Sequence, residues 1–271
     1  MRKRVLATPL SFVDVHCHLL PELDDGAASW DEALQMAEMA ADDGIATIVA
    51  TTHQLGSYAA NRPDAIRTQA DRLQAELDER GIPLTVLPGA DVRIEPGLIG
   101  KIRSGEVLTL GDRGLHVLLE LPHEVYLPLD RLLADLKKAG LVGILSHPER
   151  NRGIIAQPAV VKSLVRAGCL IQVTAASLTG GFGRRVRGVA EWLVKQGLVH
   201  LVSTDAHNTR SRPPLLAEAY DRVVELAGQA AATEWFCRSP AAIAAGKRVT
   251  PGPRSVAKPA RTSWFSWGRA A

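Results

Sequence analysis

Histidine and carboxylate residues collect in six short polar segments, each near the end of an apolar run. The segments contain His16-Cys17-His18 with Asp24 and Asp25, His53, Asp91, Glu120, Ser146-His147, and Thr204-Asp205-Ala206-His207. Imidazole and carboxylate ligands suit divalent cations such as Zn, Mn and Fe, and the lack of clustered cysteines disfavours a thiolate site. A single residue of this kind is usually structural, but six such segments together indicate a metal centre.

Nine of these residues are candidate metal ligands, which is more than one ion needs. With about four to six ligands per ion, some of them bridging and some of them water, nine residues suit two or three divalent ions. The nine are His16, His18, Asp25, His53, Asp91, Glu120, His147, Asp205 and His207. Asp24 is the alternative to Asp25, and the sequence leaves this choice open.

His16 and His18 have the spacing of a chelating pair. Residues two apart on an extended segment point to the same side, so the side chain of Cys17 is expected on the opposite face. Asp205 and His207 have the same spacing. Two of the polar segments therefore each offer a pair of ligands on one face.

Two arginines follow the histidine segments and are candidates for phosphate binding. Arg150 lies shortly after His147, and Arg212 lies shortly after His207. The planar guanidinium group suits bidentate contacts with phosphate, although each arginine alone has a surface ion pair as the alternative interpretation. The other histidines, His116, His123 and His200, are interpreted as structural, and His123 has substrate contact near Glu120 as its alternative.

Seven apolar runs alternate with helical patterns and predict the elements that position these residues. The strands are expected at 12–16, 45–51, 84–88, 116–121, 141–146, 169–174 and 198–204, and the helices at 30–42, 62–80, 128–139, 158–167, 186–196 and 214–228. Repeated β-then-α steps with apolar strands favour a closed or nearly closed parallel barrel over a doubly wound sheet. The carboxyl ends of barrel strands form one rim, where catalytic residues gather.

The net charge of +3 hides an acidic body between two basic ends. The first four residues and residues 251–271 contain seven of the 32 Lys and Arg and no acid, which leaves 25 bases against 29 acids in between. A body at −4 does not suggest a nucleic-acid partner. We expect a basic extension at 1–11, one barrel domain at 12–250, and a basic, proline-containing tail at 251–271. The tail is interpreted as a poorly ordered end, with membrane proximity or partner contact through the basic ends as the alternative.

The cysteine count and the first residues indicate the compartment. Three cysteines imply no disulfide framework, and the first 16 residues lack the sustained apolar run of a signal peptide. The protein is therefore expected in the reducing cytoplasm.

The polar segments resemble the polymerase and histidinol phosphatase (PHP) superfamily of metallophosphoesterases. More closely, they are similar to the bacterial manganese-dependent protein-tyrosine phosphatases of capsular and exopolysaccharide operons. The resemblance rests on DVHCHLLPELDDGA, ATTH, GADVR, LLELP, LSHPERN and STDAHNTRSRPP, and it covers roughly residues 12–245.

The resemblance implies a distorted seven-stranded (β/α)7 barrel with its metal site at the C-terminal rim of the strands. It implies one ion held by His16, His18 and Asp205, a second by His147 and Glu120 with Asp91 bridging, and a third by Asp25, His53 and His207. Manganese is the expected metal, with Fe and Zn as alternatives, and Arg150 and Arg212 would bind phosphate. The chain departs from the family where Asp91 replaces the usual Glu and where Thr52 precedes His53.

The implied activity is hydrolysis of phosphotyrosine by metal-activated water, on a protein such as a tyrosine autokinase of polysaccharide export. The alternatives are a small-molecule phosphoesterase on the same barrel, acting on histidinol phosphate or a sugar phosphate, and a non-catalytic regulatory barrel. A cysteine-type tyrosine phosphatase is excluded because it needs Arg six residues after its Cys. Those positions hold Leu23, Ala175 and Ile243.

Overall fold

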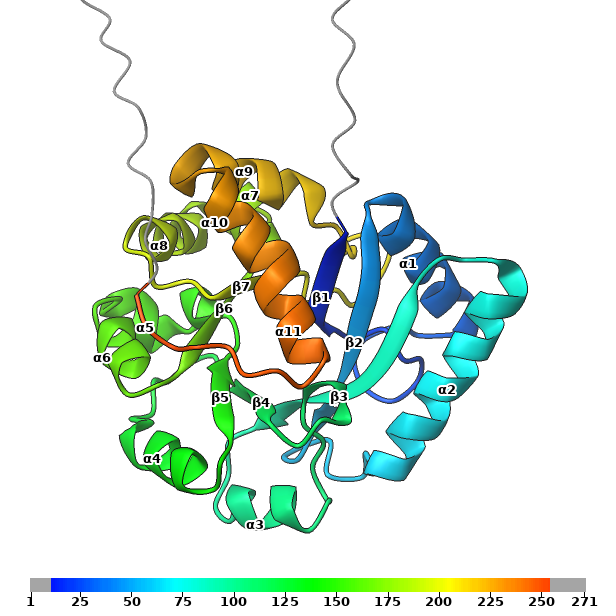
Figure 1. The fold of residues 1–271 in the computed structure, drawn as a ribbon, viewed down its shortest axis with the longest axis horizontal. Helices are drawn as coiled ribbons and strands as arrows, with labels where there is room; N and C mark the ends of the chain where they lie inside the picture. Colours follow the sequence, from blue (N-terminus) through cyan, green and yellow to red (C-terminus); the bar gives the residue numbers. More distant parts are fainter. Residues whose placement is uncertain (1–10, 254–271) are drawn as a thin grey trace, which may run out of the picture.

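Seven parallel strands follow one another around the molecule in chain order (Figure 1). They are β1 (Phe12–Cys17), β2 (Ile45–Gln54), β3 (Thr85–Arg93), β4 (His116–Glu120), β5 (Val142–Leu145), β6 (Leu170–Thr174) and β7 (Leu201–Ser203). Every neighbouring pair from β1 to β7 is parallel. The predicted barrel and all seven predicted strands are confirmed. The computed structural model describes residues 11–253, and the predictions for residues 1–10 and 254–271 lie outside it.

An outer layer of helices covers the strands. The six predicted helices are present as α1 (Trp30–Asp42), α2 (Pro63–Arg80), α4 (Asp130–Lys138), α6 (Val160–Arg166), α8 (Gly183–Lys195) and α9 (Ala217–Ala227). Helix α2 shows how the sequence specifies these helices. Pro63 occupies its first turn, Ile66 and Leu73 belong to its buried face, and Gly81 ends it with a positive φ of 69°. Within residues 11–253, no helix is both long enough and apolar enough to cross a bilayer.

Several short helices were not predicted from the sequence. They are α3 (Leu98–Arg103), α5 (Arg152–Ala156), α7 (Ala175–Thr179), α10 (Gln229–Thr233), α11 (Ser239–Ala244), a π-helical turn (Glu234–Arg238), and the 3₁₀ turns Leu110–Asp112 and Pro148–Arg150. Elements of three to six residues are too short to show a helical period in the sequence.

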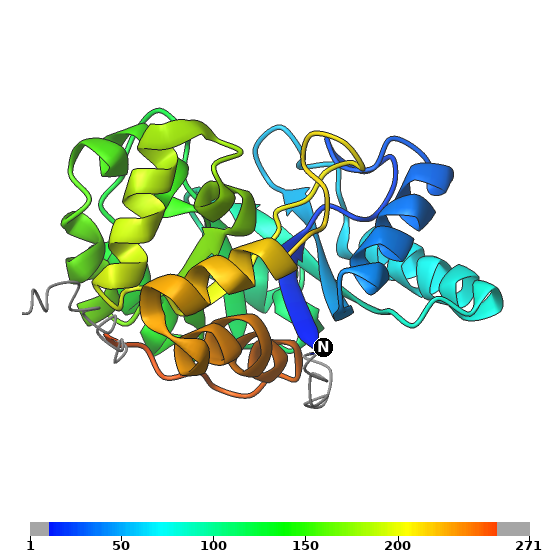
Figure 2. The ribbon, with the colours of Figure 1, turned by 90° about the horizontal axis from the view of Figure 1, so that it is seen from above.

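The barrel interior is filled by its own small core. This core contains Val13, Val15, Val49, Leu118, Ile144, Leu170 and Leu201 from the strands, together with Ile243 and Ala244 from α11. Figure 2 shows α11 at the end of the barrel where β1 begins. The apolar side chains and α11 close that end, so the polar rim lies at the opposite end, where the strands terminate.

An extra residue in β1 changes which side chains face the barrel axis. Asp14 pairs with Ile48 and Cys17 with Ala50, so three steps along β1 match two along β2. Such a bulge re-aims the side chains that follow it. Val15 belongs to the inner core, whereas Cys17 packs in the outer core and leaves His16 on the inner side.

The carboxylate of Asp14 holds this bulge against the last strand. It is fully buried and accepts hydrogen bonds from the backbone N–H of His16 (3.1 Å), from the N–H of Thr204 (3.1 Å) and from the Thr204 hydroxyl (2.5 Å). Burial raises the pKa of Asp14 to about 6, although these hydrogen bonds oppose the shift. One side chain therefore joins β1 to the segment after β7.

We expect Asp14→Ala to lower the free energy of unfolding by about 3 kcal/mol or more, because it leaves two buried N–H groups without an acceptor. Asp14→Asn is the matched control, since its amide oxygen still accepts from both N–H groups and should keep most of the stability. Urea unfolding followed by circular dichroism in a chelating buffer measures both. Unfolding of Asp14→Ala within about 1 kcal/mol of the wild type would contradict this role.

Candidate metal centre

The nine predicted ligands meet at the C-terminal rim of the barrel. They form four overlapping groups, and the ligand atoms of each group lie within 4.8 Å of one another. The groups are His18, Asp25, His53 and His207; His16, His18 and Asp91; His16, His147 and Asp205; and His53, Asp91 and Glu120. Segments far apart in the chain thus deliver side chains to one place.

His16 and His18 form the centre of the cluster. Their Nε2 atoms lie 3.3 Å apart, and Oδ1 of Asp205 lies 3.2 Å from Nε2 of His16 and 3.4 Å from Nε2 of His18. The side chain of Cys17 packs outward, as its spacing predicts. The β1 bulge therefore presents two imidazoles to one carboxylate.

Asp24 orients the neighbouring groups. Its Oδ2 lies 2.8 Å from Nδ1 of His18 and accepts the N–H of His53 (2.8 Å), while its Oδ1 accepts the N–H of Gly26 (3.0 Å). A side chain on Gly26 would lie 2.3 Å from the His18 carbonyl oxygen, so only glycine permits this close turn. Because Nδ1 of His18 faces Asp24, its Nε2 is free for a metal.

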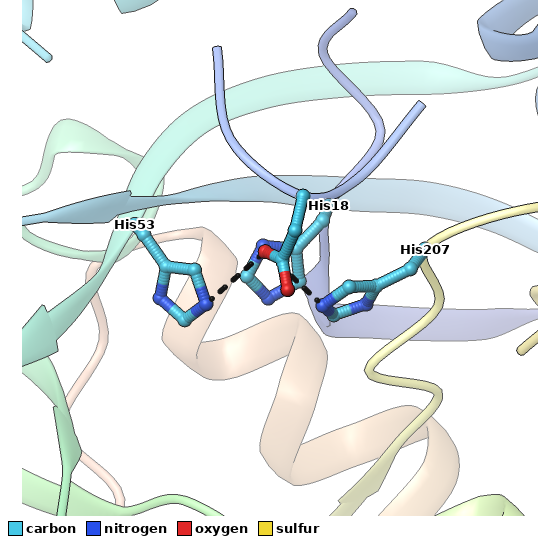
Figure 3. Close-up of side chains that lie close together, drawn as sticks. His18, His53 and His207 are labelled. Carbon is cyan, nitrogen blue, oxygen red and sulfur yellow. Dashed lines mark ion pairs between the residues drawn. The ribbon is translucent and has the colours of Figure 1, made fainter. Parts of the chain in front are cut away.

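Asp25 points toward the open side of the same group. Its Oδ1 lies 3.5 Å from Nε2 of His53 and 3.6 Å from Nε2 of His207, and its side chain is 55% exposed. Figure 3 shows His18, His53 and His207 converging on one carboxylate, with the two ion pairs drawn as dashed lines. The adjacent acids therefore have different surroundings, which the sequence alone does not distinguish.

Asp91 lies inside β3, because this strand runs to Arg93. The sequence had predicted a shorter strand at 84–88, with Asp91 in the loop after it. Both of its carboxylate oxygens are buried, and neither has a hydrogen-bond partner among the described residues. Oδ2 lies 3.5 Å from Nε2 of His16 and 3.5 Å from Nδ1 of His53. Two ligands about 2.1 Å from one ion lie about 3–3.5 Å apart. An unpartnered buried carboxylate with this spacing fits a bound cation.

Glu120 completes the group on the β4 side. Its Oε2 lies 3.8 Å from Nδ1 of His53. Burial and the neighbouring charge of Asp91 raise the pKa of Glu120 to about 8. The resemblance had grouped His147 with Glu120, whereas the structure places His147 with His16 and Asp205 and places Glu120 with His53 and Asp91.

The protonation preferences of the histidines show an excess of negative charge at the centre. Burial alone would lower the pKa of His18, but Asp24 and Asp205 outweigh it and raise the pKa to about 9. For His16, burial also lowers the pKa, and Asp205 and Asp91 raise it well above its usual value. A buried imidazole that gains a proton lies in a field that attracts cations.

The outer histidines have the opposite preference. Burial, together with the charge of His18, lowers the pKa of His207 to about 2. Burial and the charge of Arg150 lower the pKa of His147 well below its usual value. Metal binding requires the neutral form of imidazole, and these two side chains already favour it.

Asp205 connects the histidine cluster to the two arginines. Arg150 pairs with its Oδ2, and Nη2 of Arg212 lies 2.5 Å from the same oxygen. Asp205 and His147 have positive φ values of 51° and 30°, which are strained for residues other than glycine. Strain of this kind concentrates at functional sites, where the surrounding structure enforces it.

Three side chains of the site were not singled out from the sequence. Oε1 of Gln172 accepts the N–H of His147 (3.2 Å) and lies 3.0 Å from Nδ1 of His16, which leaves Nε2 of His16 free for a metal. Phe182 places its ring 4.7 Å from the guanidinium carbon of Arg150 and 6.0 Å from that of Arg212. Asp14 is the third. The only signal for Asp14 and Gln172 was a polar residue inside an apolar strand.

The remaining histidines are placed as follows. Nδ1 of His200 accepts the N–H of Ile171 (3.1 Å), and its Nε2 lies 3.1 Å from the carbonyl oxygen of Gly252. His116 is buried, and burial with the charge of Arg248 lowers its pKa to about 4. The ring of His123 stacks on His147 at 5.7 Å, at the edge of the metal centre.

The fold and the site together define a parallel β/α-barrel protein with a histidine and carboxylate cation centre at its C-terminal rim. Residues 12–245 match the model of the family described as "Capsular polysaccharide synthesis, CpsB/CapC". The chain belongs to this CpsB/CapC family, as the motifs of the sequence predict.

Relatives in sequence and structure agree with this assignment. The chain is 38% identical over 202 residues to the tyrosine-protein phosphatase YwqE of Bacillus subtilis, covering 74% of this chain and 79% of the relative. It is 29% identical to the putative tyrosine-protein phosphatase CapC of Staphylococcus aureus, and this match covers 77% of this chain and 82% of the relative.

Solved structures give the same result. A crystal structure from the work on YwqE of B. subtilis and CpsB of Streptococcus pneumoniae, described as metal-dependent tyrosine phosphatases, superposes with a TM-score of 0.83 and 32% identity. It covers 91% of this chain and 99% of that one. A lactonase from Listeria monocytogenes, at a TM-score of 0.56 and 15% identity, shares the fold alone.

We expect Asp24→Asn and Asp25→Asn to weaken metal binding in different ways. Asp24→Asn disturbs the orientation of His18 and should lower Mn²⁺ affinity about 10–100-fold. Asp25→Asn removes an oxygen that faces His53 and His207, and should reduce the number of tightly bound ions by one. Isothermal titration and metal content after dialysis measure these effects.

The exposed acid Asp31 on α1 supplies the control for these two variants. Asp31→Asn removes the same charge away from the rim and should bind metal like the wild type. Wild-type affinity in Asp24→Asn would show that Asp24 does not orient His18.

Proposed function

We propose that the protein is a metal-dependent tyrosine-protein phosphatase that acts in capsular or exopolysaccharide synthesis. The observation that carries the proposal is the pair of arginines, Arg150 and Arg212, which meet on Asp205, a member of one of the four ligand groups. Its family relatives in B. subtilis and S. aureus are named as tyrosine-protein phosphatases, the latter as putative.

The proposed ligands follow the groups that the side chains form. His16, His147 and Asp205 surround one position, and His18, Asp25, His53 and His207 surround another. Asp91 and Glu120 face the space between His16 and His53. When bound there, divalent ions, with Mn²⁺ as the proposed metal, activate water at neutral pH and neutralise phosphoryl charge.

The chain's own residues bind and orient the phosphate. In the proposed complex Arg150 and Arg212 donate hydrogen bonds to the phosphoryl oxygens, whose negative charge is spread over the equatorial positions during transfer. Asp205 aligns both guanidinium groups before substrate arrives, and the ring of Phe182 lies against them. Phosphate recognition therefore needs little rearrangement of side chains.

A cysteine nucleophile is not part of this mechanism. Cys17 and Cys169 are buried and Cys237 is half-buried, and burial raises the pKa of each thiol above its usual value. Such thiols are poorly ionised, and the thiolate is the nucleophilic form. Hydrolysis then proceeds by direct attack of water on phosphorus without a covalent phosphoenzyme.

The proposed substrate is a phosphotyrosyl protein, with a tyrosine autokinase of polysaccharide export as the proposed partner and the cytoplasm as the proposed location. The small-molecule alternative, a histidinol-phosphate or sugar-phosphate phosphatase, is not favoured by the family relatives. The non-catalytic alternative conflicts with a complete set of ligands and two arginines at the rim.

We expect chelation to abolish phosphatase activity and Mn²⁺ to restore it. The metal-loaded protein should hydrolyse a phosphotyrosyl peptide with a kcat/KM at least about 10-fold above that for histidinol phosphate or glucose 6-phosphate, as proposed from its relatives, which are named as tyrosine-protein phosphatases. Steady-state kinetics on the three substrates measures this. Full activity after exhaustive metal removal, or better turnover of a small metabolite, would overturn the proposal.

The family position held by Asp91 gives a second test. We expect Asp91→Glu to weaken metal binding about 10-fold, because Oδ2 of Asp91 already lies at ligand spacing from His16 and His53 and another methylene would move the buried carboxylate out of that spacing. Metal titration and circular dichroism separate binding from folding. Tighter Mn²⁺ binding by Asp91→Glu would show that the shorter side chain is a defect of the site.

A further inference from the structure

Exposed large hydrophobic side chains gather on one loop of the described chain. Val125 is 53% exposed and Leu127 is 39% exposed, and the only other such residue in the part of the chain that the structure describes is Leu215, at 41%. Val125 and Leu127 lie between β4 and α4, on the loop that follows Glu120. Two of the three exposed large apolar side chains in the described residues therefore follow closely in sequence after Glu120, a candidate metal ligand.

Leu127 lines an apolar groove. The groove has a volume of about 620 Å³, and its walls are residues 94–100 on one side and residues 127–135 on the other. Ile94, Leu98 and Ile99 face it from the first wall, and Leu127 and Leu132 from the second. Three charged residues also line it: Glu95, which is paired with Lys101, and Arg131 and Asp135 on the second wall. The groove therefore combines apolar contact with a few charged side chains.

A smaller cavity beside the metal centre is lined by Arg93, the residue that precedes Ile94 of the groove. The backbone N–H of Ile94 lies 3.4 Å from the carbonyl oxygen of Glu120 and donates to it, so the groove begins at the end of β4. The adjacent Arg93 lines a cavity of about 170 Å³ together with Glu120 and Tyr58. The ring of Tyr58 stacks on His53 at 5.1 Å. The metal centre, the small cavity and the groove thus draw on neighbouring residues at the end of β3, namely Asp91, Arg93 and Ile94.

The size and position of the groove favour an extended polypeptide as its occupant. A stable dimer of this chain would need roughly 800 Å² of interface on each copy, whereas this groove accommodates only a few side chains. Residues 94–100 follow the end of β3, beyond Asp91 and Arg93, so a metabolite held by the metal centre does not need them. A peptide that continues from a phosphotyrosine has both an extended backbone and apolar side chains to place there.

We propose that this groove, bounded by residues 94–100 and 127–135, binds apolar side chains that flank the phosphotyrosine of a polypeptide substrate. The proposal rests on the proposed phosphatase function and identifies how the same site selects proteins over small phosphate esters. Leu127 contributes apolar contact at the edge of the groove, and Val125 extends the apolar surface along the same loop.

The test compares a double variant with a matched control on two substrates. Val125→Ser with Leu127→Ser removes the exposed apolar surface of the loop, and Leu215→Ser removes an equally exposed leucine elsewhere. The substrates are a phosphotyrosyl peptide with leucines on both sides of the phosphotyrosine, and phenyl phosphate, which has no flanking residues. All proteins are full-length and loaded with Mn²⁺.

We expect the double variant to lower kcat/KM for the peptide about 5–20-fold, mainly through a higher KM, and to leave phenyl phosphate hydrolysis unchanged. Leu215→Ser should change neither, and replacing the peptide leucines with aspartate should remove the difference between wild type and double variant. This pattern would support the groove as a substrate surface.

Four other results would overturn the proposal in distinguishable ways. Unchanged peptide kinetics would show that the groove is not used, and an equal loss on phenyl phosphate would show that the loop acts on the metal centre itself. A wild-type dimer that dissociates in the double variant, with peptide turnover unchanged, would make the groove a self-interface. Absence of metal-dependent phenyl phosphate hydrolysis in the wild type would instead overturn the proposed function, and this inference with it.

Discussion

The carboxylate of Asp14 connects the first and last strands of the barrel at the point where the metal centre begins. It binds the N–H of His16 on its own strand and both the N–H and the hydroxyl of Thr204 beyond β7. The extra residue of β1 would otherwise leave buried backbone groups without partners, at a cost of about 1–3 kcal/mol for each. With the bulge held in place, His16 and His18 face the axis and Asp205 follows directly from Thr204. The position of the central ligands therefore depends on a buried acid that offers no ligand to any of the four groups.

The charges at the rim form a gradient from the centre outward. At the centre, buried carboxylates are close enough to raise the pKa of His16 and His18 despite burial. At the edge, His147 and His207 prefer the neutral form. Asp205 is kept ionised, with a pKa well below its usual value in spite of burial, by His16 and Arg150 among others. Divalent cations at the centre would replace the protons there, and the arginines would then face a locally positive surface suited to phosphate.

The sequence predicts the strands and the ligand set because both depend on local patterns. Seven apolar runs specify seven strands, and polar residues at the ends of those runs predict the rim. The sequence could not predict which of Asp24 and Asp25 orients His18 and which faces the ligand group, because this depends on how the turn at Gly26 packs against His18. Gln172 was missed because its role is to orient the ring of His16, and these two residues are distant in sequence. The short helices of residues 229–244 were missed because they are defined by packing across the base of the barrel and not by a period of their own.

The two halves of the rim have different chemical characters, and this difference gives a direction to a bound ester. Arg150, Arg212 and Phe182 come from the segments after β5, β7 and β6, and they form the half that would hold the phosphoryl group. Glu120, Tyr58 and Arg93 come from the segments around the ends of β4, β2 and β3, and they line the small cavity on the other half. In the proposed complex, a phosphoryl group held by the arginines would leave its alcohol directed away from them, toward the half of the rim that holds that cavity. A sugar or an amino alcohol would end before the groove, whereas the polypeptide on either side of a phosphotyrosine would continue into it. The metal ligands would serve either kind of ester, so in the proposed complex it is the asymmetry of the rim that would select a polypeptide substrate.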